Sequence, residues 1–170
     1  LLQGSEPFVA GYLNDQLSYR VTGRWLHENE DFTAAGVAAG DDFERLGGNF
    51  RIDWTPSDRD QVSFQGDLFD GNAGHSTGDE DTDGRSLVLR WNRQTGSGEL
   101  QAQAFYDRFS RDSGAGGNFH ADTYDGDFQH SLTLGSQKIV WGAGARAVVY
   151  AISGTDSLFF EPPSRTLFIA

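Results

Sequence analysis

The sequence predicts an all-β protein: an antiparallel, up-and-down transmembrane β-barrel, or an open part of one, with about eight strands and the start of a ninth. Three observations support this fold class. Apolar and polar residues alternate with period two, tight-turn sequences alternate with long polar connections, and aromatic residues gather near the strand ends. In an outer-membrane barrel, the apolar residues of each strand face lipid and the polar residues face the lumen.

The alternation is clearest in residues 17–25, where Leu17, Tyr19, Val21 and Trp25 share one face and Arg20 and Arg24 share the other. A period of two is typical of strands, and helical spacing fits none of the segments. Runs of about 9 to 13 residues suit tilted membrane strands. The predicted strands lie near Glu6–Leu13, Leu17–His27, Gly47–Thr55, Asp60–Asp70, Arg85–Gln94, Glu99–Phe109, Tyr124–Leu134 and Gln137–Ser153, with a ninth from about Arg165.

The connections between these strands alternate strictly between short and long. Asn, Asp, Gly, Pro and Ser favour tight turns, and they occupy four short connections: Leu13 to Gln16, Thr55 to Asp60, Gln94 to Gly98 and Leu134 to Gln137. The long connections are predicted at about Glu28 to Leu46, Asp70 to Arg85, Ser110 to Thr123 and Ser153 to Ser164. Outer-membrane barrels have this asymmetry, with short periplasmic turns and long extracellular loops.

Aromatic residues near both ends of the predicted strands suggest interfacial girdles. One group lies close to the short turns: Tyr12, Tyr19, Trp54, Trp91 and Trp141. Trp25 and Tyr106 lie towards the long connections. The alternative is the ordinary core of a soluble β-sandwich.

Composition excludes several classes of function. The 170 residues suit a single domain, and the net charge of −12 argues against a nucleic-acid partner, which would require a basic surface. The absence of Cys excludes disulfides, thiolate nucleophiles and Cys-ligated metals. No apolar window of about 18 residues predicts a membrane helix, and no leader segment is visible. The four His residues never fall at metal-ligand spacing, and no nucleophile elbow occurs, so we expect no enzyme and no cofactor.

Seven pieces of sequence, in order along nearly the whole chain, resemble the barrels of TonB-dependent receptors. They lie at 19–25, 48–54, 65–71, 104–108, 127–130, 140–144 and 160–167, and examples are YRVTGRW and GNFRIDW. The resemblance implies that residues 1–170 are part of a 22-stranded barrel in the bacterial outer membrane. It also implies a plug domain, the partner TonB, and import of a ferric siderophore or a similar scarce nutrient. Neither plug nor TonB box is encoded here, so we expect a fragment.

In such receptors, polar side chains of the strands line the lumen. The residues predicted to do so, as candidate ligand-binding or plug-binding groups, are Arg20, Arg24, Arg51, Asp53, Asp67, Arg90, Asp107 and Asp127. Guanidinium groups on this face could bind an anionic siderophore through charge-assisted contacts. The alternative is a ladder of cross-strand ion pairs that only neutralises lumen charge.

The segment 79–84 (DEDTDG) has the opening of a calcium-binding loop, with Asp79, Asp81 and Asp83 as candidate ligands of a loop cation. An EF-hand requires a bidentate Glu at the twelfth position, where Arg90 stands, so an EF-hand is excluded. Solvated charges in an extracellular loop are the alternative explanation.

Two further functions stay open from the sequence alone. A small self-closed barrel of eight strands, structural or adhesive, would require pairing of the first and last complete strands. A soluble β-sandwich that binds carbohydrate would require the apolar faces to point inwards. The favoured prediction, a receptor barrel, instead places those faces against the lipid bilayer.

Overall fold

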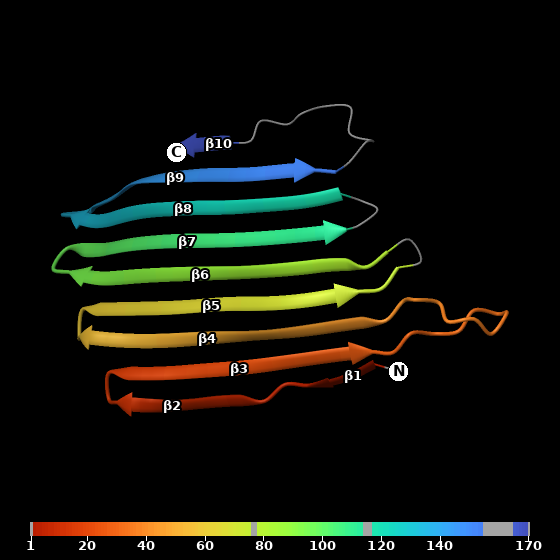
Figure 1. The fold of residues 1–170 in the computed structure, drawn as a ribbon. Helices are drawn as coiled ribbons and strands as arrows, with labels where there is room; N and C mark the ends of the chain where they lie inside the picture. The colour runs from red at the N-terminus through yellow and green to blue at the C-terminus, as the bar shows by residue number, and fades with distance from the viewer. Residues whose placement is uncertain (1, 76–77, 114–116, 155–164, 170) are drawn as a thin grey trace.

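The computed structural model describes residues 2–75, 78–113, 117–154 and 165–169. In these residues the chain forms one antiparallel sheet (Figure 1). Its strands are β1 (Leu2–Ser5), β2 (Phe8–Asn14), β3 (Leu17–Glu28), β4 (Phe43–Ser57), β5 (Asp60–Ala73), β6 (Glu80–Thr95), β7 (Gly98–Ser113), β8 (Gly117–Leu134), β9 (Gln137–Ser153) and β10 (Arg165–Ile169). From β3 onwards each strand pairs with the next along the chain.

The two N-terminal strands share one position in the sheet. β1 pairs with the loop-side end of β3 and β2 pairs with its turn-side end. Pro7 interrupts the ladder between them because proline has no backbone N–H to donate, although its carbonyl accepts a hydrogen bond from Gly23 N at 2.9 Å. The sheet therefore has nine strand positions, which confirms the prediction of eight strands and part of a ninth.

The short turns all lie at one edge, where Figure 1 shows the β2–β3, β4–β5, β6–β7 and β8–β9 connections together. Local hydrogen bonds shape these turns. Asn14 Oδ1 accepts from Gln16 N at 2.8 Å, and Ser57 Oγ donates to Asp60 Oδ2 at 2.6 Å. Gly135 has φ +62°, a left-handed conformation that favours glycine, in the last of the turns.

At the opposite edge the strands are longer than predicted. β6 begins at Glu80 rather than Arg85, β8 at Gly117 rather than Tyr124, and β7 ends at Ser113 rather than Phe109. The predicted long loops 70–85 and 110–123 are therefore wrong over most of their length. The connection after β3 is long, since β4 begins at Phe43. Most of the last predicted loop, 153–164, lies outside the described residues.

The described residues contain no buried hydrophobic side chain. Large apolar side chains are instead exposed: Leu68 by 60%, Trp141 by 52% and Val21 by 50%. A β-sandwich requires two sheets that enclose a core, and this single sheet has none, so the sandwich alternative is wrong. The described part contains no helix of the length and hydropathy needed to cross a membrane.

The two edges of the described sheet do not pair with each other. β2 pairs with β3, and β9 pairs with β8 and β10. A self-closed eight-stranded barrel needs a bond between its first and last complete strands, which this arrangement lacks. The described sheet is open, and the other described residues leave its large apolar side chains exposed.

Candidate functional site

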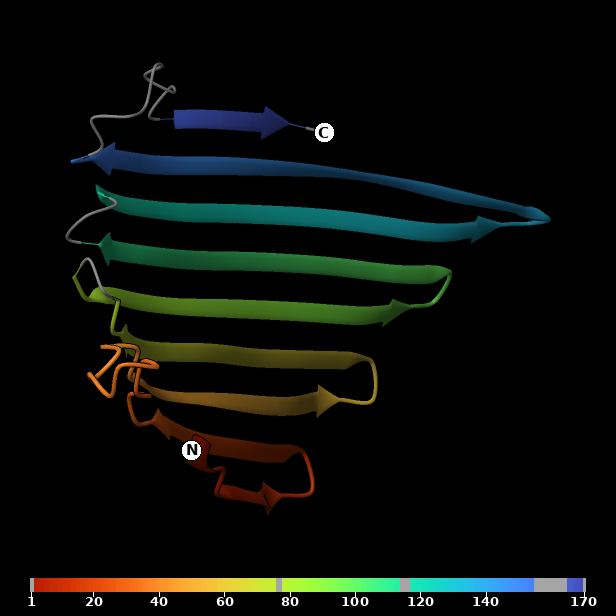
Figure 2. The ribbon, with the colours of Figure 1, turned by 90° about the vertical axis from the view of Figure 1, so that its right-hand side faces the viewer.

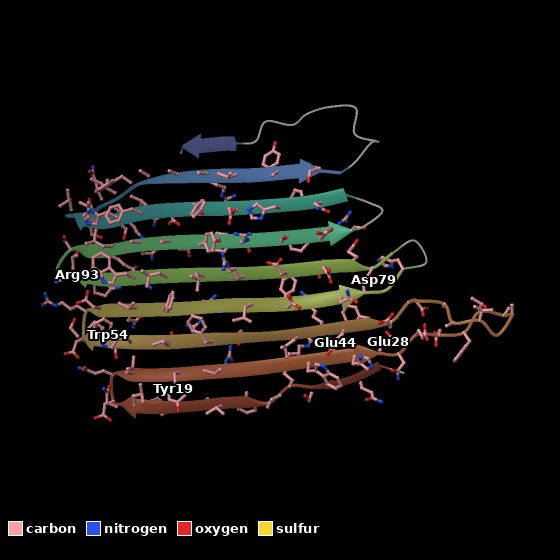
Figure 3. All side chains as sticks on the ribbon, viewed as in Figure 1. Tyr19, Glu28, Glu44, Trp54, Asp79 and Arg93 are labelled. Carbon is pink, nitrogen blue, oxygen red and sulfur yellow. The ribbon has the colours of Figure 1, made fainter. Side chains whose placement is uncertain are left out.

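Strand register assigns each side chain to a face of the sheet, because directly paired residues point to the same side. Ile52, Phe64 and Leu89 are paired in one row and define the apolar face. Arg51, Gln65 and their paired neighbours lie on the other side, here called the polar face. Figure 3 shows the side chains along the sheet, with Tyr19 and Trp54 towards the turn edge and Glu28 and Glu44 towards the loop edge.

The apolar residues form a band that runs obliquely across the strands. On β4 the band extends from Leu46 to Trp54, and on β8 from Tyr124 to Leu132. Register places Trp54 and Phe128 in the same row. The turn-side border of the band lies at Trp54 on β4 but at Leu132 on β8. It therefore moves by four residues (128 to 132) over the four steps from β4 to β8. Eight residue steps (46 to 54) correspond to about 26 Å along a strand.

This shift gives the tilt of the strands relative to the band. One residue per strand corresponds to about 3.3 Å of rise for each 4.8 Å of strand spacing, or a tilt of about 35°. Transmembrane barrel strands tilt by roughly 35–45°. Figure 2 shows the same stagger, because each successive hairpin turn lies farther along the strand direction.

Aromatic residues lie at both borders of the band. Trp54 and Trp91 occupy one row at the turn side, and Tyr106 and Tyr124 are paired at the loop side with ring centroids 5.1 Å apart. Tyr12 does not belong to this arrangement, because it pairs with Ser18 on the polar face. Tyr12 lies close to the β2–β3 turn, as predicted, but on the polar face of the sheet.

All eight predicted lumen residues lie together on the polar face: Arg20, Arg24, Arg51, Asp53, Asp67, Arg90, Asp107 and Asp127. The period-two pattern fixed this grouping. Within the described strands, neither Arg20 nor Arg24 forms an ion pair. Their role in binding a ligand stays a prediction.

Several other charged residues of this face form hydrogen bonds or ion pairs with neighbours on the sheet. Arg51 makes two 2.8 Å hydrogen bonds to Asp53 of the same strand and one of 3.2 Å to Gln65. Arg90 donates to Gln103 at 2.5 Å. A cross-strand Arg–Asp pair of the kind expected joins Arg146 to Asp125 at 2.7 Å. The expected ladder of ion pairs is therefore only partly formed, and amides take some of its positions.

Near the loop edge the two faces exchange polarity. The face that is apolar at mid-strand continues towards the loop edge with Asp70, Asp83 and Asp112. The polar face continues with Phe69 and Phe109. Apolar and polar residues still alternate, but each face now has the opposite polarity. This exchange explains why residues 80–84 and 117–123 were predicted to be loops.

Phe69, Phe109 and Phe119 form an aromatic ladder on the polar face. Ring centroids are 6.4 Å apart between Phe69 and Phe109 and 6.2 Å apart between Phe109 and Phe119. Gly84 lies between Phe69 and Phe109 in the same row, and a Cβ there would collide with the Phe69 ring. Glycine at 84 thus allows the ring of Phe69 to lie across β6.

A cleft of about 350 Å³ adjoins this ladder on β3 to β5. Its polar-face lining includes two of the predicted residues, Arg24 and Asp67, and adds Phe43, Arg45 and Phe69. The Arg45 guanidinium carbon is 3.9 Å from the centroid of the Phe69 ring, a cation–π contact. The sequence did not identify these three as site residues, because they lie on the loop side of the polarity exchange. The alternation that continues beyond Gly47 was the signal that could have identified them.

Two of the three candidate cation ligands, Asp81 and Asp83, lie in a strand rather than in a loop. Glu80 to Gly84 belong to β6, with Asp81 and Asp83 on one face of the strand and Asp79 just before it. Asp81 Oδ1 accepts a hydrogen bond of 2.7 Å from Asn72. Within the described residues no group of three or more His, Cys, Asp or Glu side chains could hold a metal ion.

Two solved structures with a similar fold are a copper transporter and a siderophore receptor. The copper transporter OprC superposes with a TM-score of 0.64 and 17% identity over 88% of this chain. The siderophore receptor PirA from Pseudomonas aeruginosa superposes with a TM-score of 0.67 and 14% identity over 98% of this chain. No protein-family model and no curated protein matches the sequence.

The chain spans 27% of OprC and 28% of PirA. An oblique apolar band, short turns on one edge and an open sheet are what such a part of a large barrel would have. The chain therefore has the fold of part of a TonB-dependent receptor barrel, and the resemblance seen in its sequence is confirmed at the level of fold.

Proposed function

We propose that residues 1–170 are part of a larger barrel in the bacterial outer membrane, belonging to a TonB-dependent receptor that imports a ferric siderophore or a similar scarce nutrient. The apolar face contacts lipid and the polar face lines the lumen. A plug domain and TonB would be the protein partners, as in the family that the sequence resembles. We propose no enzymatic reaction for this sheet.

The oblique apolar band is the observation that carries the membrane part of the proposal. A soluble sheet has no reason to shift its apolar band obliquely from strand to strand, as seen between β4 and β8. A planar bilayer imposes such a shift, because tilted strands enter and leave the hydrocarbon at successive rows. In water the same exposed residues would form a contiguous apolar patch across neighbouring strands, which soluble monomers rarely expose.

The loop-side half of the polar face supports the receptor part. Arg24, Arg45 and the aromatic ladder place cations beside aromatic faces, a combination suited to an anionic ligand with flat or apolar parts. Arg24 lies one position inside the loop-side border of the band and Arg45 one position beyond it, close to the height where an incoming nutrient would first meet the lumen. The names of the two structural neighbours suggest metal-linked nutrients, a copper ion or a ferric siderophore.

Cysteine labelling in intact cells tests the proposed topology, since the natural chain has no cysteine. We expect Ala35→Cys, in the connection between β3 and β4, to react with a membrane-impermeant maleimide from outside. Ser136→Cys, in a short turn, should react only after the cells are opened. Ile52→Cys, on the apolar face, should stay unlabelled in both cases. Equal labelling of Ile52→Cys and Ala35→Cys would refute the membrane orientation.

Uptake measurements test the proposed substrate class. Cells that carry or lack the gene are compared under iron limitation with a panel of radiolabelled ferric siderophores and with copper. Gene-dependent and TonB-dependent uptake of one ferric siderophore is the expected result. Uptake of copper alone would assign the protein to the other nutrient class, and no gene-dependent uptake would refute an import function.

A further inference from the structure

Small residues interrupt the apolar band across three neighbouring strands. Ala104 on β7, Gly126 on β8 and Ala145 on β9 are paired in one row of the apolar face. They form the floor of a groove of about 550 Å³. Larger side chains of the same face border the groove, namely Phe64, Leu87, Leu89, Tyr106 and Tyr124. Its volume is within the range of roughly 300–1,000 Å³ seen for small-molecule sites.

The groove does not arise from a close backbone approach at Gly126. A Cβ at this position would have no neighbour nearer than Gln103 O, at 3.9 Å. A larger residue would therefore fit without strain and would fill the groove. Leu89, Trp91 and Phe128, in the same and the next row, have the size that is usual for this band.

Two guanidinium groups lie just beyond the loop-side end of the groove. Arg85 and Arg108 are direct cross-strand partners on the apolar face. They are two residues, or about 6.6 Å, beyond Leu87 and Tyr106. Like charges directly opposite each other on a sheet are destabilising, so this pair favours the presence of an anion between them.

The carboxylate of Asp122, the direct cross-strand partner of Arg108, attracts its guanidinium group but forms no ion pair with it. Asp122, next in the row, accepts a hydrogen bond of 2.9 Å from Tyr106 and pairs with His120 at 2.7 Å. Among the described residues, no ion pair joins Arg85 or Arg108 to a carboxylate. Arg85 instead lies over the Tyr106 ring, with its guanidinium carbon 5.9 Å from the ring centroid.

We propose that the groove and the two arginines form one binding site for a phosphate-bearing lipid of the surrounding leaflet. An acyl chain occupies the groove over Gly126, and the phosphate lies on Arg85 and Arg108. Guanidinium groups match phosphate geometry through paired N–H donors. Tyr106 and Tyr124 lie at the level where aromatic residues meet lipid headgroups. The site rests on the proposed function, because it requires the apolar face to be in lipid.

Asp70 and Asp83 lie one row farther from the groove. They offer a second way to hold a phosphate, through a bridging divalent cation. The proposed contact is direct, so binding should persist when divalent cations are removed. The tests are therefore carried out in EDTA.

Native mass spectrometry measures lipid binding at this site, with the protein purified from outer membranes in mild detergent. Phosphatidylglycerol and phosphatidylcholine with the same acyl chains are titrated in EDTA. We expect one tight phosphatidylglycerol adduct in the wild type. Arg85→Gln with Arg108→Gln should weaken it about tenfold and remove the preference over phosphatidylcholine. The matched control, Arg59→Gln with Lys138→Gln, removes two charges at the turn edge and should keep the preference.

The groove is tested by Gly126→Leu, which should weaken binding of both lipids. Gly144→Leu, which places the same side chain on the polar face of the next strand, is its control. Equal binding of both lipids by the wild type, loss of binding in EDTA, or equal effects of variant and control would overturn the proposal. A protein that stays dispersed without detergent would instead refute the membrane assignment itself, so the two failures are distinguishable.

Discussion

The turn-side and loop-side halves of this sheet use the same alternation for opposite purposes. In the turn-side half, the face with Ile52, Phe64 and Leu89 is apolar and the face with Arg51 and Gln65 is polar. In the loop-side half, the first face carries Asp70 and Asp83, and the second carries Phe69 and Phe109. The strands run through the exchange without interruption. Secondary structure is therefore set by alternation itself, whereas the polarity of each face is set by the surrounding medium.

In the proposed orientation, the exchange marks the outer border of the membrane. On its turn side, lipid would contact the outside of the sheet, and the lumen side carries the polar groups. On its loop side, water would contact the outside, and the lumen side can expose aromatic residues to a ligand. We therefore expect the same kind of substitution to have different effects in the two halves of the sheet.

The largest expected effect comes from a charge in the middle of the band. Leu89→Arg should destabilise the folded protein in lipid vesicles by about 2–4 kcal/mol, because an arginine near the bilayer midplane is poorly solvated. Ser110→Arg, on the same face beyond the border, should change stability by less than about 0.5 kcal/mol. Guanidinium unfolding in vesicles, followed by heat-modifiable migration on a gel, measures both. Equal costs at the two positions would show that the exchange does not mark the membrane.

Ligand binding should depend on the loop-side half of the sheet and on its polar face. Phe69→Ala removes the ring beneath Arg45 and opens the aromatic ladder. We expect it to weaken binding of the proposed ferric-siderophore ligand about 2- to 30-fold, the range that corresponds to a lost cation–π contact. Phe64→Ala, on the apolar face of the same strand, is the matched control and should leave binding unchanged. Whole-cell binding of the radiolabelled siderophore gives the comparison, and an equal loss in both variants would contradict it.

The sequence predicted the turn-side half nearly completely. Period two placed Arg20, Arg51 and Asp127 on one face, and tight-turn residues placed the four hairpins. This prediction succeeded because each face keeps one polarity along the middle of the strands. It failed where the polarity of the faces changes.

The loop-side half was underpredicted for the same physical reason. Asp81 and Asp83 looked like loop residues because strands were identified by apolar residues on a fixed face. Arg45 and Phe69 were missed as site residues because their cleft forms only when β3, β4 and β5 are in register. Cross-strand register depends on long-range pairing, which local periodicity does not contain.

The smallest expected effect lies at the turn edge and depends on pH. Asp60, which lies beyond the turn-side border of the band, accepts hydrogen bonds from Ser57 Oγ and from Trp91 Nε1 at 2.6 and 3.0 Å. The Ser57 hydroxyl first, and then the Trp91 indole, lower the pKa of Asp60 below its ordinary value of 3.8. A depressed pKa means that this contribution to stability is fully present above pH 3.8 and is lost as the pH falls through the lower, folded-state value.

Asp60→Asn should therefore remove a small part of the acid sensitivity without altering the fold. The measurement is the difference between unfolding midpoints at pH 6 and pH 3, for wild type and variant, because the other carboxylates titrate in both proteins. Asp58→Asn, in the same turn and without these hydrogen bonds in the described structure, is the control. A variant with the same pH difference as the wild type would show that the Trp91–Asp60 contact does not anchor this edge. The turn-side border of the band would then be defined only by its rows of apolar residues, with no contribution from this contact.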